Sequence, residues 1–68
     1  MVKELQKNKL YQWTAPQYAS GLVFRVIRIT PRSFIIRYVN SPYRDFVDTL
    51  ELSNSFVTFN LYNLKQIG

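Results

Sequence analysis

The stretch GLVFRVIRITPRSFIIRYV, residues 21–39, decides the fold of this chain. Two runs rich in β-branched and aromatic residues, 22–30 and 33–39, flank a short break with the sequence TPRS. These residue types favour a pleated, half-buried surface, and a proline at the second position of a turn fixes φ for a tight reversal. The stretch therefore predicts a long β-hairpin.

The spacing of two arginines conflicts with regular alternation in the first half of this hairpin. Arg25 and Arg28 are three residues apart, so a regular strand would turn them to opposite faces of the sheet. Burying an unpaired arginine is costly. A β-bulge near Val26-Ile27 would turn both arginines outward, and it would turn Ile27 and Ile29 toward the core. We therefore predict a bulge at this position.

The returning strand adds one more arginine to the same outer face. Phe34, Ile36 and Tyr38 form one face of that strand, which leaves Ile35 and Arg37 on the other. The hairpin should thus present three arginines on its outer face and a fourth at its turn, namely Arg25, Arg28, Arg37 and Arg32. The side chains expected to be buried together are Phe24, Val26, Ile36 and Phe59.

The rest of the chain predicts further short strands. Tyr11 and Trp13 share one face of a strand at 10–14, and we expect this aromatic pair to be buried. Asn8 suits a left-handed turn just before that strand. The other predicted elements are a loose segment at 1–8, a loop at 15–21, strands at 46–52 and 56–59, a single 3₁₀ turn at 60–64 and a closing strand at 65–68.

Length and composition predict a small basic protein. With 68 residues the chain has room for a single domain, 1–68. Nine Lys and Arg against four Asp and Glu give a net charge of +5, which favours anionic partners as well as solubility. The chain has no cysteine, and no apolar run approaches the roughly 20 residues of a membrane-spanning helix. We therefore expect a cytoplasmic protein without membrane contact.

The composition also excludes the common catalytic sites. Without Cys and His the chain cannot form a nucleophile–histidine dyad or the usual zinc sites. Gly21 and Gly68 are too few for a glycine-rich phosphate loop. Of the acids Asp45, Asp48 and Glu51, the last two would face opposite sides of a strand and could not converge. We expect a non-enzyme with no cofactor and no metal.

Three segments together resemble the arrangement of SH3-like barrels. They are the strand before the loop at 15–21, the hairpin of VFRVIRIT and SFIIRYV, and FNLYNLKQIG at 59–68. The resemblance implies an all-β fold, a small five- to six-stranded SH3-like barrel with a 3₁₀ turn before the last strand. It does not include the proline-peptide groove of signalling SH3 domains. The alternative, a five-stranded oligonucleotide-binding fold, usually needs a longer chain. The short single domain also resembles small phage-encoded proteins.

Nucleic-acid binding is the first functional hypothesis. Arginine pairs with phosphates and stacks on bases, and tyrosine adds stacking platforms. The acids at 45–51 would oppose a nucleic-acid backbone. The candidate residues are Arg25, Arg28, Arg32, Arg37, Lys7, Lys9, Tyr38 and Tyr43, with Lys3, Lys65 and Trp13 as further candidates.

Protein binding is the second hypothesis, as an inhibitor, an adaptor or a part of a larger assembly. Five Phe, five Tyr and one Trp exceed the needs of so small a core, and Tyr, Trp and Arg dominate interface hot spots. An exposed strand edge could also pair with a partner strand or with a second copy of the chain, which would give a homodimer. The candidate residues are Tyr18, Trp13, Tyr43 and Tyr62, and Tyr18 has a structural alternative as a lid over the core.

Overall fold

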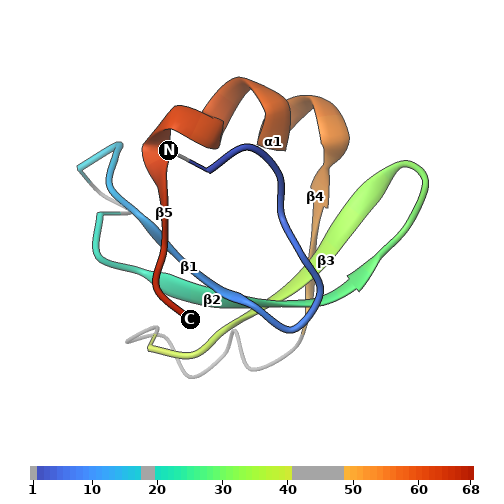
Figure 1. Ribbon diagram of the computed structural model, residues 1–68, viewed down its shortest axis with the longest axis horizontal. Coiled ribbons are helices and arrows are strands. Elements are labelled where there is room, and N and C mark those ends of the chain that lie inside the picture. The colour runs from blue at the N-terminus through green and yellow to red at the C-terminus, as the bar shows by residue number, and fades with distance from the viewer. Residues whose placement is uncertain (1, 18–19, 41–48) are drawn as a thin grey trace.

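The computed structural model describes residues 2–17, 20–40 and 49–68. They form one antiparallel five-stranded sheet, in the order β4-β3-β2-β1-β5, and a short helix that lies over one face of that sheet (Figure 1). The elements are β1 (Leu10–Trp13), β2 (Val23–Ile29), β3 (Ser33–Tyr38), β4 (Leu50–Ser53), α1 (Asn54–Asn60), the 3₁₀ turn η2 (Leu61–Asn63) and β5 (Leu64–Gln66). None of the helices in the described part of the chain is long and apolar enough to cross a membrane.

The predicted hairpin and its bulge are both confirmed. Val26 pairs with Ile36, but the next pair joins Arg28 to Ile35, so the register shifts and Ile27 has no partner. Val26 and Ile36 are fully buried, and Arg28 therefore faces outward, opposite Ile35. Ile29 pairs with Phe34 and so faces the inner side of the sheet, as expected. It remains 45 % exposed because it is the last residue of β2, at the margin of the core.

The core lies between the inner face of the sheet and α1. Tyr11 and Trp13 of β1 are buried, as expected, and so are Phe24, Val26 and Ile36. The N-terminal segment is not loose, because its Val2 and Leu5 are buried beside α1. Asn8 has a φ of 68°, which confirms the left-handed turn ahead of β1. The buried cluster consists of Val2, Leu5, Tyr11, Trp13, Phe24, Val26, Ile36, Val57 and Leu64.

The strand predicted at 56–59 was wrong, because this segment belongs to helix α1. The Ser53 hydroxyl accepts a hydrogen bond from the Phe56 amide at 3.1 Å and so caps the helix N-terminus. In a strand Val57 and Phe59 would share a face, but in a helix they lie about 200° apart. Val57 is accordingly buried, whereas Phe59 is 75 % exposed and does not join the core.

The sheet is open rather than closed into a barrel. Its two edges are β4 and β5, and α1 with η2 connects them across the inner face (Figure 1). The predicted 3₁₀ turn is confirmed at 61–63, and the closing strand forms at 64–66, one residue earlier than expected. The last part of the strand predicted at 46–52 corresponds to β4, and residues 46–48 lie outside the described residues.

Candidate functional site

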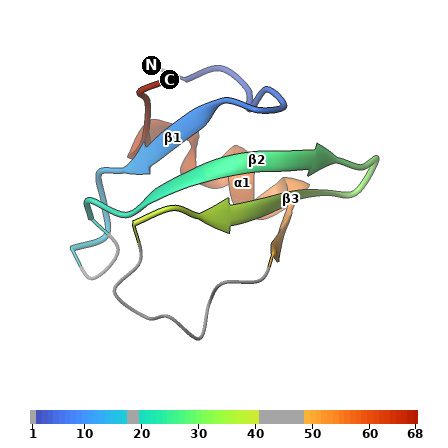
Figure 2. The ribbon, with the colours of Figure 1, turned by 90° about the horizontal axis from the view of Figure 1, so that it is seen from below.

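The outer face of the β2–β3 hairpin carries three exposed arginines, Arg25, Arg28 and Arg37, which we call the arginine face. Arg25 and Arg37 are direct cross-strand partners, and the bulge turns Arg28 to the same side. Figure 2 shows this side of the molecule, with β1, β2 and β3 side by side and α1 behind them. Without the bulge, Arg25 and Arg28 would face opposite sides of the sheet. With it, all three arginines form one continuous positive surface.

The direct pairing of Arg25 with Arg37 has a cost in stability. Like charges opposite each other on two strands repel, since their Cβ atoms are only about 5 Å apart. The Arg25 guanidinium donates a hydrogen bond from Nη1 to the Asn8 carbonyl oxygen at 3.1 Å, which orients this side chain. The pair thus concentrates positive charge at one place, and an anion placed there would relieve the repulsion.

Further cations flank the arginine face. Lys65 of β5 pairs with Gln12 of β1, a position on the outer side of the sheet. The Asn8 amide donates to the Val26 carbonyl oxygen at 2.7 Å, and the Val26 amide donates to the Lys9 carbonyl oxygen at 3.1 Å. These bonds bring the chain around exposed Lys7 and Lys9 beside the middle of β2. The structure thus brings together three of the six predicted basic site residues, Arg25, Arg28 and Arg37, and it places the backbone at Lys7 and Lys9 beside β2.

Arg32, another of the predicted basic residues, lies apart from the arginine face. It occupies the turn between β2 and β3, where its carbonyl oxygen accepts a hydrogen bond from the Asn54 amide at 3.0 Å. An acid also borders the arginine face, because Glu51 of β4 pairs with Ile35 on the outer side of the sheet. Among the described residues the other acid is Glu4, in the N-terminal segment.

Tyr38, which was expected to offer a stacking platform to bases beside the arginines, does not lie on the arginine face. Its ring packs edge-on against buried Phe24, with ring centroids 6.0 Å apart, and its hydroxyl accepts a hydrogen bond from Trp13 Nε1 at 3.0 Å. Trp13 is only 4 % exposed. Both rings therefore lie on the inner side of the sheet, opposite the arginine face. Tyr43, the other predicted platform, lies outside the described residues.

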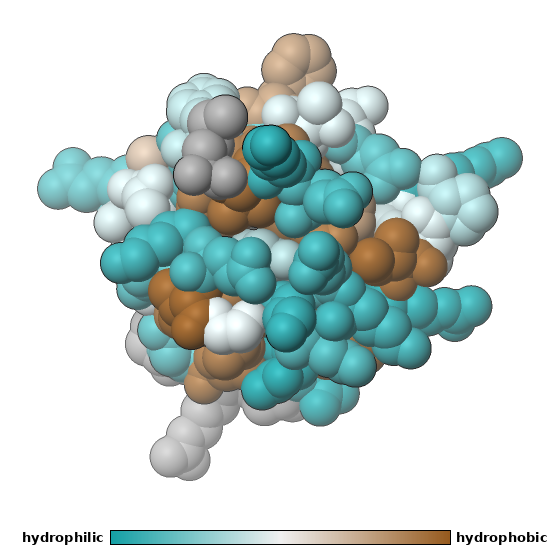
Figure 3. Space-filling view, viewed as in Figure 1, coloured by the Kyte–Doolittle hydropathy of each residue, from teal (hydrophilic) through white to brown (hydrophobic). Residues whose placement is uncertain are grey.

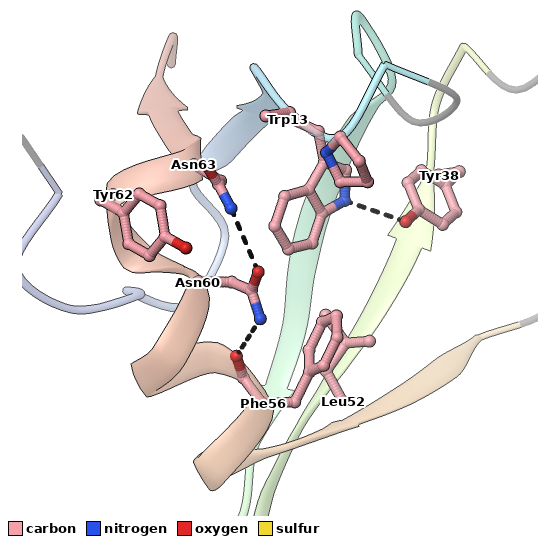
Figure 4. Close-up of a pocket in the computed structure, with 9 residues that line it drawn as sticks. Trp13, Tyr38, Leu52, Phe56, Asn60, Tyr62 and Asn63 are labelled. Carbon is pink, nitrogen blue, oxygen red and sulfur yellow. Dashed lines mark hydrogen bonds between the residues drawn. The ribbon is translucent and has the colours of Figure 1, made fainter.

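A second surface feature lies on the inner side of the sheet, where β1, β3 and β4 meet α1 and η2. It is a cavity of about 560 Å³, which we call the aromatic groove (Figure 4). It joins two of the predicted protein-binding residues, Trp13 and Tyr62, while Tyr18 and Tyr43 lie outside the described residues. Its lining consists of Trp13, Ala15, Pro16, Tyr38, Leu52, Phe56, Asn60, Tyr62 and Asn63.

Sequence reasoning missed the part that α1 plays in this groove. Phe56 and Tyr62 are 46 % and 70 % exposed beside it. Asn60 Nδ2 donates to the Phe56 carbonyl oxygen at 2.8 Å, and Asn63 Nδ2 donates to Asn60 Oδ1 at 3.2 Å (Figure 4). These two hydrogen bonds link α1 to η2 along one wall of the groove. Apolar atoms are exposed at the end of the molecule where α1 lies and also at other places on the same face (Figure 3). The signal available in the sequence was Ser53, a preferred helix N-cap residue.

No protein-family model matches this chain, and no curated protein or solved structure shows significant similarity to it. Two surfaces on opposite sides of the sheet offer the chemistry from which a function can be inferred. The arginine face is charged and exposed, whereas the lining of the aromatic groove contains no charged residue.

Proposed function

We propose that this chain is a non-enzymatic binding module that contacts the phosphates of nucleic acid through its arginine face. The observation that carries the proposal is the bulge, because it places Arg28 beside the cross-strand pair of Arg25 and Arg37. Guanidinium groups match phosphate geometry with paired hydrogen bonds, and they keep their charge at any physiological pH. Keeping two like charges opposite each other lowers stability, and phosphate binding provides a physical reason for that cost.

The flanking lysines enlarge the positive surface, so that it suits a polyanion better than a single phosphate. Lys65 lies on the outer side of β5, the backbone at exposed Lys7 and Lys9 runs beside the middle of β2, and the whole chain has a net charge of +5. Each phosphate contact releases condensed counterions from nucleic acid. Binding should therefore be strong at low ionic strength and should fall steeply as salt is added.

Two double variants of equal net charge test the proposal. Arg25→Gln/Arg37→Gln removes two charges from the arginine face, whereas Lys3→Gln/Arg32→Gln removes two charges elsewhere. Fluorescence anisotropy with a labelled oligonucleotide at low salt should show about tenfold or greater weakening for the first variant and a much smaller change for the second. Equal losses in both variants would mean that net charge alone drives binding, and no binding by the parent would end the proposal.

A second candidate function is protein binding through the aromatic groove. The observation that favours it is the exposure of Phe56 and Tyr62 at the edge of an uncharged cavity. Tyrosine and other aromatic side chains supply large contact areas at interfaces with little loss of conformational entropy. A photo-crosslinking amino acid at Tyr62 should then trap a discrete protein in cells, and one at Arg37 should not. A diffuse or absent product at Tyr62 would exclude this function.

We also propose that the fold is SH3-like and that the protein acts in the cytoplasm. The first statement is supported by the long hairpin and by the 3₁₀ turn η2 just before β5. The second is supported by the absence of cysteine from the sequence. An experimental structure in which the edge strands β4 and β5 lie side by side and close the sheet would support the SH3-like assignment. Imaging of a tagged chain would test the location in the cell.

A further inference from the structure

We infer that the arginine face binds double-stranded nucleic acid in preference to single strands. This inference rests on the proposed function and names the ligand class for the same site. It follows from where the sheet places the aromatic side chains relative to the arginines.

In the described part of the chain, no aromatic residue shares the outer face with the arginines. Arg25 pairs with Leu10 on one side, and Arg28 pairs with Ile35 on the other, so aliphatic side chains surround the charges. The described aromatics lie on the inner face of the sheet or on α1 and η2, and they are Tyr11, Trp13, Phe24, Phe34, Tyr38, Phe56, Phe59 and Tyr62.

This separation matters because single strands and duplexes offer different groups to a protein. Proteins that bind single strands without sequence preference stack successive bases on aromatic side chains and guide the backbone along a basic groove. Here the sheet itself stands between Arg37 and the aromatic groove, since Arg37 faces outward while its neighbour Tyr38 faces inward. A single strand on the arginine face would therefore gain phosphate contacts without stacking its bases on any aromatic side chain of the described residues.

A duplex needs no stacking partner, because its bases already stack on one another. It also carries one negative charge per about 1.7 Å of its axis, which is about twice the density along one strand. The cations from Lys65 on β5 to Arg37 on β3 cross three strand spacings, a distance of about 14 Å at roughly 4.8 Å each. Along β2, Arg25 and Arg28 are about 10 Å apart. A surface of this size can contact several phosphates of a duplex at once.

A competition experiment with the intact chain tests the inference. A labelled mixed-sequence DNA duplex is bound at low salt and displaced by unlabelled duplex DNA, duplex RNA of the same sequence, or either constituent strand, at equal phosphate concentration. We expect each duplex to compete at about fivefold lower concentration than either strand, because its charge density is higher and because the described part of this face offers no aromatic side chain to unpaired bases. If duplex DNA and duplex RNA displace the labelled duplex at similar concentrations, the phosphates that both carry are the groups that the arginine face recognises.

Variants separate the inference from the function on which it rests. Arg25→Gln/Arg37→Gln should lose duplex binding, whereas Phe56→Ser/Tyr62→Ser, which alters two exposed aromatics of the aromatic groove, should bind the duplex as the parent does. If single strands compete as well as the duplex, the duplex inference is overturned but nucleic-acid binding is not. Loss of duplex binding in the folded aromatic variant would have the same consequence. No binding of duplex or strand would overturn both. Thermal melting of each variant shows whether it is folded.

Discussion

Arg25 of β2 and Arg37 of β3 stand directly opposite each other on the exposed side of the sheet. Because side chains of a cross-strand pair are neighbours, these two positive charges repel each other. The same register turns Arg28 outward through the bulge at Ile27. One irregularity in the hairpin thus creates both the local repulsion and the surface proposed to bind phosphates.

The repulsion makes a prediction about stability. Replacing Arg37 by Glu would turn the like-charge pair with Arg25 into an opposite-charge pair, and this should stabilise the fold by roughly 0.2–1 kcal/mol. In a domain of this size the melting temperature should rise by a few degrees, about 4–8 °C per kcal/mol. Arg32→Glu at the hairpin turn is the control, with the same charge change away from the pair. A melting temperature that falls in Arg37→Glu, or rises equally in the control, would contradict the like-charge account.

The buried centre of the hairpin predicts a large stability loss. Ile36 is fully buried opposite Val26, so Ile36→Ala removes apolar burial and leaves a cavity, at a cost of about 2–5 kcal/mol. The matched control is Ile29→Ala, since Ile29 is 45 % exposed at the end of β2 and should cost clearly less. Urea unfolding followed by Trp13 fluorescence measures both. Equal losses would mean that the register of the hairpin is not as described.

The cap of α1 predicts a local effect. Ser53→Ala removes the hydroxyl that accepts a hydrogen bond from the Phe56 amide, which should cost about 1 kcal/mol and weaken the helical signal in circular dichroism. Ser55→Ala is the control, because Ser55 lies inside the helix and makes no such cap. If the two alanine variants behave alike, the Ser53 side chain is not what begins the helix.

The acid beside the arginine face predicts a gain in binding. Glu51 of β4 lies on the outer side of the sheet and opposes an approaching backbone. Glu51→Gln should tighten duplex binding at low salt by roughly twofold or more, and the gain should shrink as salt screens the charge. Glu4→Gln in the N-terminal segment makes the same charge change on another part of the molecule. A larger gain from Glu4→Gln would place the binding surface elsewhere.

The sequence was sufficient to predict the hairpin, the bulge and the outward arginines, because the high free-energy cost of burying an unpaired charge determines which way the strand residues face. An unpaired arginine cannot be buried, so Arg28 had to face outward and the alternation had to shift. The same parity argument placed Tyr38 on the inner face with Ile36. The stacking role assigned to Tyr38 conflicted with that placement, and the structure shows the inward position.

Helix α1 could not be predicted from its own residues. FVTF at 56–59 has strand-forming residue types, and its helical form depends on the Ser53 cap and on burial of Val57 beneath the helix. The aromatic groove could not be predicted from the sequence either. It joins Pro16, Leu52 and Tyr62, which are distant in the sequence and come together only when α1 lies over the sheet.

The salt dependence of duplex binding tests the central claim most directly. In the parent chain the logarithm of the binding constant should fall linearly with the logarithm of the salt concentration. Arg25→Gln/Arg28→Gln/Arg37→Gln deletes three phosphate contacts, so the steepness of this line should decrease by about 2.7 while the melting temperature stays at or slightly above that of the parent. An unchanged slope in a folded triple variant would contradict the claim that the arginine face holds the phosphates.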